Sequence, residues 1–294
     1  MTNAQPSILS PVPAGKFLTL HLAPDADARA ALARLAEIPH QADLIVGLGD
    51  PWLRALTCTI EGLRPFPSLS GPKGAVPSTQ GDLWLSLGGK DQGTLLHRAR
   101  SLLGQLGNSF SLVEEVSTFV FDSGRDLSGY EDGTENPKGE RAAEVALVTG
   151  SRPGWTGSSF VAAQRWVHDL TTLERMPLHE QDQVIGRRHG SNEEIGDAPA
   201  SAHVKRAAQE SFQPEAFMLR RSMPWGDLRQ HGLYFVAFAR SLDPFERVLT
   251  RMVGLEDGIA DALFRFTRPV TGGYYWCPPV RDGRLDLRAL GVSK

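Results

Sequence analysis

Three short segments of the sequence each carry one residue able to do proton or metal chemistry. GYEDGTENP, beginning at residue 129, contains Asp132, SAHVKR contains His203, and LRRSMPWG contains Arg220. A carboxylate can move protons, a neutral imidazole can bind a metal ion, and a guanidinium can stabilise developing negative charge. One hypothesis is that Asp132, His203 and Arg220 act together in a single site.

Each of these residues also has an ordinary structural interpretation. The Asp-Gly pair of the first segment is typical of a tight turn whose carboxylate caps nearby N–H groups. Arg220 follows an apolar segment and could simply form an ion pair. Of the eight histidines, His168 competes most strongly with His203 as a ligand. Its position at the end of an expected strand favours a hydrogen-bonding role instead.

The composition is that of a globular protein without a strong electrostatic bias. The chain has 294 residues, of which 41% are hydrophobic and 22% are charged, and its formal net charge is −3. This balance predicts no nucleic-acid partner and no membrane partner. We see neither a signal-peptide pattern in the first ten residues nor a window of roughly 18 apolar residues, so we expect a cytoplasmic protein. Cys58 and Cys277 are too few for a disulfide framework.

The elements that position these residues follow the order β-α-β-β-α-β twice. In the first half we expect strands at 17–22, 44–48, 82–87 and 113–121, and helices at 28–35, capped by Asp25, and at 94–106. In the second half we expect strands at 160–167, 216–220, 233–239 and 274–277, and helices at 172–185, from Asp243 as the cap to 254, and at 260–266. The pattern predicts an α+β fold of two ferredoxin-like halves, residues 1–150 and 151–294, with paired sheets or a barrel-like core.

The order and spacing of the motifs resemble those of one enzyme family. The chain is similar to the dye-decolourising peroxidases and most similar to their bacterial B-type group, including the YfeX-like porphyrinogen peroxidases. The resemblance rests on GxxDG extended to GYEDGTENP, IGR ending at Arg187, the His203 segment, LRRSMPWG, and FTRPVTGGYYWCP at 266–278. It implies the dimeric α+β barrel type of fold over nearly the whole chain.

The resemblance assigns a role to each candidate residue. It makes His203 the axial iron ligand of a haem b, which would be non-covalent because the chain has no Cys-x-x-Cys-His motif. It places Asp132 and Arg220 on the distal side as catalytic and haem-contacting residues, and it pairs Arg187 with a haem propionate. Ser222 stands where many B-type members have asparagine, and we include it as a third distal residue. Asp261 is a candidate acceptor for the imidazole N–H of His203.

The activity that the resemblance implies is a haem peroxidase. Such an enzyme would reduce hydrogen peroxide through a ferryl intermediate and oxidise phenols, dyes or porphyrinogens in one-electron steps, and the family usually assembles as homo-oligomers. A haem-handling protein that stores, delivers or strips iron from haem is the alternative. A third possibility is a member of the same fold that binds no haem. Aromatic residues such as Trp225 could relay electrons, although core packing is their ordinary role.

Overall fold

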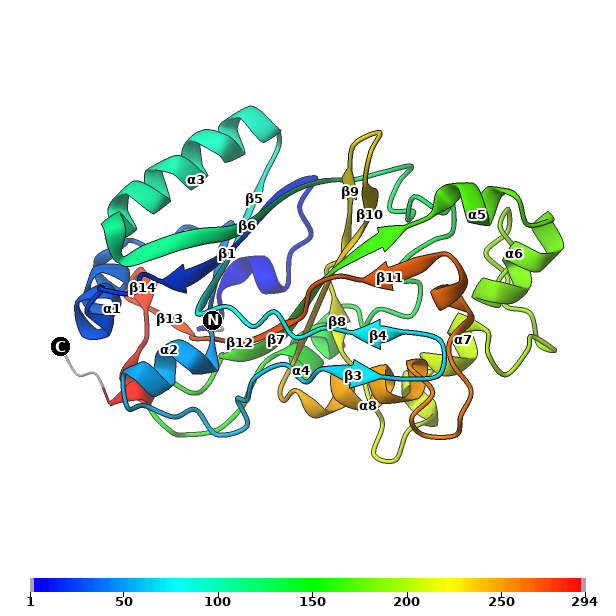
Figure 1. Ribbon diagram of the computed structural model, residues 1–294. Helices are drawn as coiled ribbons and strands as arrows, with labels where there is room; N and C mark the ends of the chain where they lie inside the picture. The colour runs from blue at the N-terminus through cyan, green and yellow to red at the C-terminus, as the bar shows by residue number, and fades with distance from the viewer. Residues whose placement is uncertain (1–2, 292–294) are drawn as a thin grey trace.

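The computed structural model describes residues 3–291 and has two halves of similar construction (Figure 1). The elements of the first half are the 3-10 helix η1 (Pro6–Ile8), β1 (Ala14–Leu22), α1 (Ala28–Glu37), β2 (Leu44–Leu48), α2 (Asp50–Ala55), β3 (Leu69–Ser70), β4 (Ala75–Val76), β5 (Leu83–Gly89), α3 (Gln92–Leu106), η2 (Gly107–Ser109) and β6 (Phe110–Phe119). All four strands and both helices expected here are present, with ends shifted by a few residues.

The second half repeats the plan with additional short helices. Its elements are α4 (Glu140–Ala146), β7 (Ser159–His168), α5 (Leu170–Glu174), α6 (Leu178–Ile185), α7 (His203–Arg206), η3 (Gln209–Ser211), β8 (Leu219–Arg220), β9 (Met223–Gly226), β10 (His231–Ala239), α8 (Asp243–Met252), η4 (Ala262–Arg265), β11 (Thr267–Pro269), β12 (Gly273–Cys277), β13 (Val280–Arg281), β14 (Arg284–Leu285) and η5 (Arg288–Leu290). The expected strand 216–220 is reduced to the two residues of β8.

The two halves join into one closed antiparallel barrel. Within the halves the strand orders are β2-β5-β1-β6 and β12-β7-β10-β9, which is the ferredoxin-like order in both cases. The pairs Thr118–Trp225 and Leu48–Trp276 connect the halves, and β7 pairs with β10, so the eight strands form a ring. The expected duplication and the barrel are therefore both confirmed.

Local sequence explains where the helices begin, and it corrects three expectations. The cap of α1 is Asp27, whose carboxylate accepts from the N–H groups of Arg29 and Ala30, and not Asp25. Asp243 is the first residue of α8 and does not cap it. The helix expected at 172–185 is two helices, because Pro177 lacks an N–H and interrupts the hydrogen-bonding ladder between α5 and α6.

Alternating side chains give the barrel an interior distinct from its helix-covered outer surface. A buried cluster takes members from all eight strands, among them Phe17, Trp84, Tyr234 and Tyr275. Phe17 stacks on Tyr234 with ring centroids 4.3 Å apart, and the Trp84 indole N–H donates to the Tyr234 hydroxyl at 3.0 Å. The barrel interior is thus largely filled by packed side chains.

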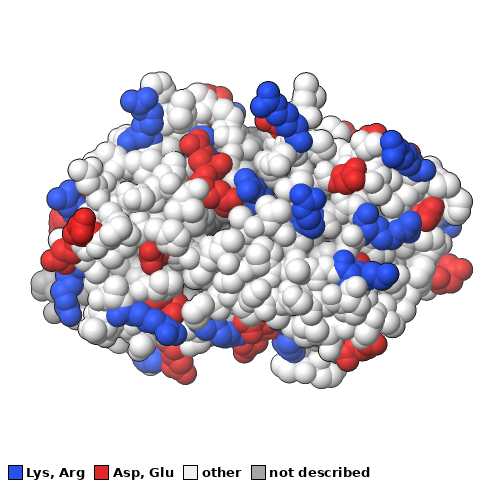
Figure 2. All heavy atoms as spheres, in the orientation of Figure 1, with Lys and Arg blue, Asp and Glu red and all other residues white. Residues whose placement is uncertain are grey.

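The surface carries charges of both signs. On the face shown in Figure 2, acidic and basic side chains are interspersed and neither sign forms a continuous field. Among residues 3–291 we find no helix that is long and apolar enough to cross a membrane.

We expect His40, in the loop between α1 and β2, to make stability depend on pH. Burial lowers its pKa from 6.5 to about 4, against a smaller opposing effect of Asp43, and neither ring nitrogen has a hydrogen-bond partner among the described residues. The unfolded chain therefore binds a proton that the folded chain does not, so this contribution to stability is complete above pH 6.5 and is lost as pH falls towards 4.

The corresponding experiment compares the wild type with His40→Leu, which cannot titrate. Moving from pH 7.5 to pH 5 should cost the wild type about 2 kcal/mol more unfolding free energy than the variant. Urea unfolding at both pH values measures the difference. Equal losses in the two proteins would show that His40 does not carry this pH dependence.

Candidate functional site

A cavity of about 1000 Å³, counting its open mouth, lies in the second half against the outer side of β7 and β10. Its walls come from the loop that carries GxxDG, from β7 and β10, and from helices α7 and α8. The apolar part of the wall is formed by Trp166, Ile185, Met218, Leu233, Phe235, Phe245, Val248, Leu249, Met252, Leu263 and Phe266. Asp132, His203 and Arg220 all reach the same cavity, as the family resemblance implies.

His203 is the first residue of the four-residue helix α7, and two contacts hold that helix in place. Arg206 in the same helix is buried and makes paired 2.8 Å hydrogen bonds to both carboxylate oxygens of Asp257. Just before α7, the Ser201 carbonyl accepts from the N–H of Ala262 at 2.7 Å. A helix this short has little stability of its own, so these contacts fix the direction of the imidazole.

The same arrangement brings Asp261 beside His203. The carboxylate of Asp261 lies 2.8 Å from Nδ1 of His203, and its other oxygen accepts from the N–H of Leu263. Asp261 has no exposed side-chain surface. A hydrogen bond at Nδ1 directs the lone pair of Nε2 outward, so His203 is prepared to bind a metal through Nε2. The expected contact between Asp261 and His203 is present.

The contacts of His168 differ from those of His203. His168 is the last residue of β7, and its Nε2 lies 3.0 Å from the Asp126 carboxylate, while its Nδ1 lies 2.6 Å from the Thr267 hydroxyl. Both ring nitrogens are therefore engaged, whereas no partner is found for Nε2 of His203 in the described part of the chain. The hydrogen-bonding interpretation of His168 is the one that the geometry favours.

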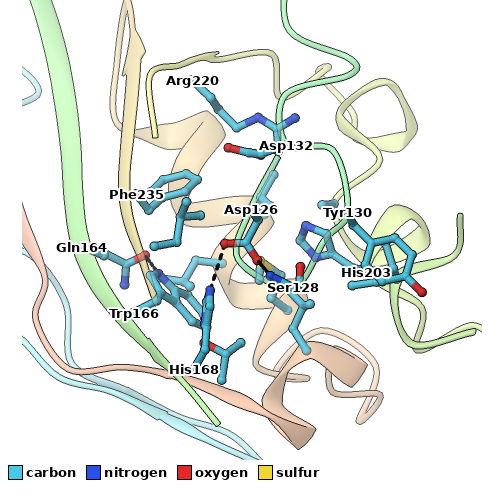
Figure 3. A pocket seen from close by; sticks show the side chains of 18 of the residues that line it. Asp126, Ser128, Tyr130, Asp132, Gln164, Trp166, His168, His203, Arg220 and Phe235 are labelled. Carbon is cyan, nitrogen blue, oxygen red and sulfur yellow. Dashed lines mark hydrogen bonds and ion pairs between the residues drawn. The ribbon is translucent and has the colours of Figure 1, made fainter. Parts of the chain in front are cut away.

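Asp132 and Arg220 lie side by side above the imidazole of His203 in the view of Figure 3. The nearest atoms of the two side chains, Oδ1 of Asp132 and Nη1 of Arg220, are 3.6 Å apart. The pair is largely shielded, since 25% of the Asp132 side chain and 17% of the Arg220 side chain are exposed. Nε of Arg220 is buried without a partner among residues 3–291. The pair thus presents an acid–base group and a hydrogen-bond donor to one cavity.

The glycines of GxxDG make this presentation possible. Gly129 and Gly133 have φ values of +86° and +74°, which favour glycine. A Cβ at Gly129 would also lie 2.4 Å from Nε2 of His189. The loop therefore turns twice within five residues and points Asp132 inward. Asp132 therefore lines the cavity and is not simply a surface turn residue, as the local sequence pattern alone would suggest.

Two expected site residues lie elsewhere. Arg187 is not in the cavity wall, and its guanidinium contacts the carboxylates of Glu135 at 2.9 Å and Glu194 at 3.3 Å. Ser222 lines a second cavity of about 1010 Å³ that shares Asp132 and Arg220 with the first, and its hydroxyl accepts from the N–H of Val236 at 3.4 Å. The roles of both residues stay predictions.

The structure shows a hydrogen-bonded group of polar residues that the sequence did not predict. Asp126, His168 and Thr267 form a continuous hydrogen-bonded row in the cavity wall. Burial alone would raise the pKa of Asp126, but hydrogen bonds from His168 and Ser128 outweigh it and lower that pKa below its ordinary value. The three residues are far apart in sequence. The only sequence signal for this row is that a histidine and an aspartate commonly form a hydrogen-bonded pair.

These features define a class of protein: a barrel of two ferredoxin-like halves with an apolar-walled cavity that a histidine and an acid–arginine pair both reach. Comparison with known proteins identifies the family. The model of the Dyp-type peroxidase N-terminal domain matches residues 7–120, and that of the C-terminal domain matches residues 123–282. The chain belongs to the Dyp-type peroxidase family and is a peroxidase.

Individual relatives agree with this assignment. A dye-decolorizing peroxidase of Mycobacterium tuberculosis is 30% identical, over 95% of this chain and 89% of its own length. A deferrochelatase of Escherichia coli is 27% identical over 69% of this chain and 56% of its own length. Among solved structures, a dye-decolorizing protein from V. cholerae has a TM-score of 0.85 at 28% identity and covers 98% of this chain and 99% of its own. A variant of DypB from Rhodococcus jostii RHA1 in complex with heme has a TM-score of 0.84 at 29% identity, covering 92% and 94%.

The residues of the cavity fit a haem. An apolar wall suits the porphyrin, and the free Nε2 of His203 suits iron. Two buried donors in the wall, Nε of Arg220 and Nε2 of Gln164, lack partners within the described structure. Unpaired buried donors are costly, and a polar ligand in the cavity would satisfy them.

Proposed function

We propose that this protein is a haem-dependent peroxidase in which His203 binds the iron and Asp132 and Arg220 act on hydrogen peroxide. One observation carries the proposal: His203 has an anchored Nδ1 and an Nε2 without a partner among residues 3–291, and it shares its cavity with the acid–arginine pair. We also propose that the protein belongs to the B-type, YfeX-like subgroup of the family. The proposal also includes a homo-oligomer and phenolic, dye or porphyrinogen donors.

Haem, held by His203, would supply the iron and the redox chemistry that couple the reduction of one peroxide to two one-electron oxidations. Asp132 accepts the proton of the inner peroxide oxygen and returns it to the outer oxygen, which then leaves as water. Arg220 stabilises the negative charge that develops as the O–O bond breaks. Asp261 holds the proton on Nδ1 of His203 and so keeps Nε2 available to the metal.

Arg187 and Ser222 belong to the proposed site as a haem-propionate partner and a third distal residue. Arg187 would have to leave Glu135 and Glu194 to reach the cavity, because these carboxylates hold it in the present arrangement. Ser222 would contribute through the second cavity, which adjoins the distal pair and provides space for a small reactant. We propose the propionate contact of Arg187 and the distal role of Ser222 as secondary parts of the site.

A haem-handling protein is the second candidate, favoured by the likeness to a deferrochelatase. The acid–arginine pair favours catalysis, because storage or delivery needs no acid–base group at the iron. The test is to reconstitute the purified protein with haemin and mix it with one equivalent of hydrogen peroxide. A peroxidase should change its absorption spectrum rapidly and then oxidise a phenol. A protein that binds haemin but reacts slowly would support haem handling, and one that binds none would contradict both candidates.

We expect Asp261→Asn to weaken the haem site without emptying it. Asparagine keeps the size and an acceptor oxygen but removes the charge that polarises the Nδ1 proton of His203. Loss of such a partner typically costs about 10–100-fold in metal affinity or activity. The variant should also show a higher midpoint potential of the iron, measured by redox titration. An unchanged potential would mean that Asp261 does not act on the ligand.

A further inference from the structure

The segment that follows Asp132 is tied directly to the strand that carries Arg220. The side-chain amide of Asn136 makes two hydrogen bonds of 2.8 Å, donating from Nδ2 to the carbonyl of Arg220 and accepting at Oδ1 from the N–H of Arg220. The side chain of Asn136 therefore hydrogen-bonds both the N–H and the carbonyl of Arg220.

The position of β8 explains why Arg220 needs this contact. β8 is the last strand of its sheet, and β10 is the one strand it pairs with in the described part of the chain. The N–H of Arg221 donates to the carbonyl of Val236 on that side. Because successive residues of a strand direct their polar groups to opposite sides, those of Arg220 point away from β10. At this free edge the amide of Asn136 replaces a neighbouring strand.

Few residues separate Asn136 from Asp132 in the loop. A turn joins Gly133 to Asn136, with the N–H of Asn136 donating to the Gly133 carbonyl at 2.9 Å. Asp132 is the residue before this turn. The path from Asp132 to Arg220 through Asn136 therefore crosses one turn and one pair of hydrogen bonds. The distance between the charged atoms of Asp132 and Arg220, 3.6 Å, is longer than either hydrogen bond of Asn136, which measure 2.8 Å.

We propose that Asn136 is a positioning residue that sets the separation and orientation of Arg220 relative to Asp132. The inference rests on the proposed function of this pair. Asn136 is not proposed to contact substrate, because it acts through the backbone of Arg220. Proton transfer and charge stabilisation depend on the geometry of the reacting groups, so a small displacement of Arg220 should slow the peroxide step.

The test uses the haem-loaded protein and measures the rate constant for its reaction with hydrogen peroxide. We expect Asn136→Ala to lower this constant about tenfold and to weaken fluoride binding, an equilibrium probe of distal hydrogen-bond donors, while haem content stays the same. Asn136→Asp keeps the acceptor but sets a carboxylate oxygen against the Arg220 carbonyl, so it should lose at least as much as Asn136→Ala. If Asn136→Ala does not fold, this isosteric variant carries the test.

Asn192→Gly is the matched control. Asn192 also holds the loop through two side-chain hydrogen bonds, to Glu131 at 2.8 Å and to Thr134 at 3.0 Å, but it does not contact β8. Its φ of +57° suits glycine, so the substitution removes the bonds without straining the backbone. The control should leave fluoride affinity unchanged. Equal losses in Asn136→Ala and Asn192→Gly would overturn the proposal in favour of general loosening of the loop.

A double-variant cycle provides the second criterion. If Asn136 acts through Arg220, adding Asn136→Ala to Arg220→Ala should change the rate constant by less than about twofold. A further tenfold loss in the double variant would contradict the proposal. These outcomes are distinct from failure of the proposed function, in which the wild-type protein itself would not bind haem or react with peroxide.

Discussion

His203→Ala should abolish axial ligation of the haem. Iron would lose the only imidazole that faces the cavity with a free nitrogen within the described structure. The loss in haem affinity should exceed the roughly 10–100-fold that removal of an outer partner such as Asp261 costs. The measurements are haem content after reconstitution and the absorption and electron paramagnetic resonance spectra of any haem that remains. An unaltered spectrum would exclude His203 as the ligand.

His168→Gln is the control for this prediction, because His168 lines the same cavity. Both of its nitrogens are engaged, by Asp126 and Thr267, so its replacement should lower stability but keep the spectrum of an axial histidine. His203→Gly extends the test, since external imidazole should enter the vacated space and restore the spectrum. Restoration in His203→Gly together with retention in His168→Gln would establish which histidine binds iron.

Much of the fold could be predicted from sequence because the long elements carry strong periodic patterns. The elements near the site that the sequence did not predict are short. β9 has four residues and contains Pro224, which is unfavourable inside a strand. The helix α7 has four residues and no side-chain cap, so neither periodicity nor a start signal marks it. Both lie beside the site, where tertiary contacts such as that of Arg206 with Asp257 replace local preference.

The site was less accessible to sequence reasoning than the fold. Asp132, His203 and Arg220 could be selected by residue type and motif, and they do share one cavity. Arg187 also belongs to a motif, yet its guanidinium contacts Glu135 and Glu194 outside the cavity wall. The contact of Asn136 with the backbone of Arg220 joins residues 84 positions apart. Hydrogen bonds to a backbone leave no pattern in side-chain types, so only the structure could place them.

Arg220→Ala should leave haem binding nearly intact and slow the reaction with peroxide. The guanidinium lies on the side of the cavity opposite His203 and does not hold the iron. Removal of one donor that stabilises developing charge typically costs about 10²–10³ in rate. Stopped-flow mixing of the haem-loaded variant with peroxide measures this loss, and pyridine haemochrome analysis measures haem content. A rate equal to that of the wild type would remove Arg220 from the mechanism.

Comparison with Asp132→Asn separates the two parts of the distal pair. Asparagine cannot accept the peroxide proton, and loss of a positioned proton acceptor costs about 10²–10⁴ in rate. If the two residues act in one step, the double variant should lose much less than the product of the single losses, because neither group works fully without the other. Independent roles would give multiplied losses instead. Arg220→Lys refines the comparison, since lysine keeps the charge but loses the planar array of donors. A rate near that of Arg220→Ala would then show that donor geometry, which Asn136 is proposed to set, matters more than charge.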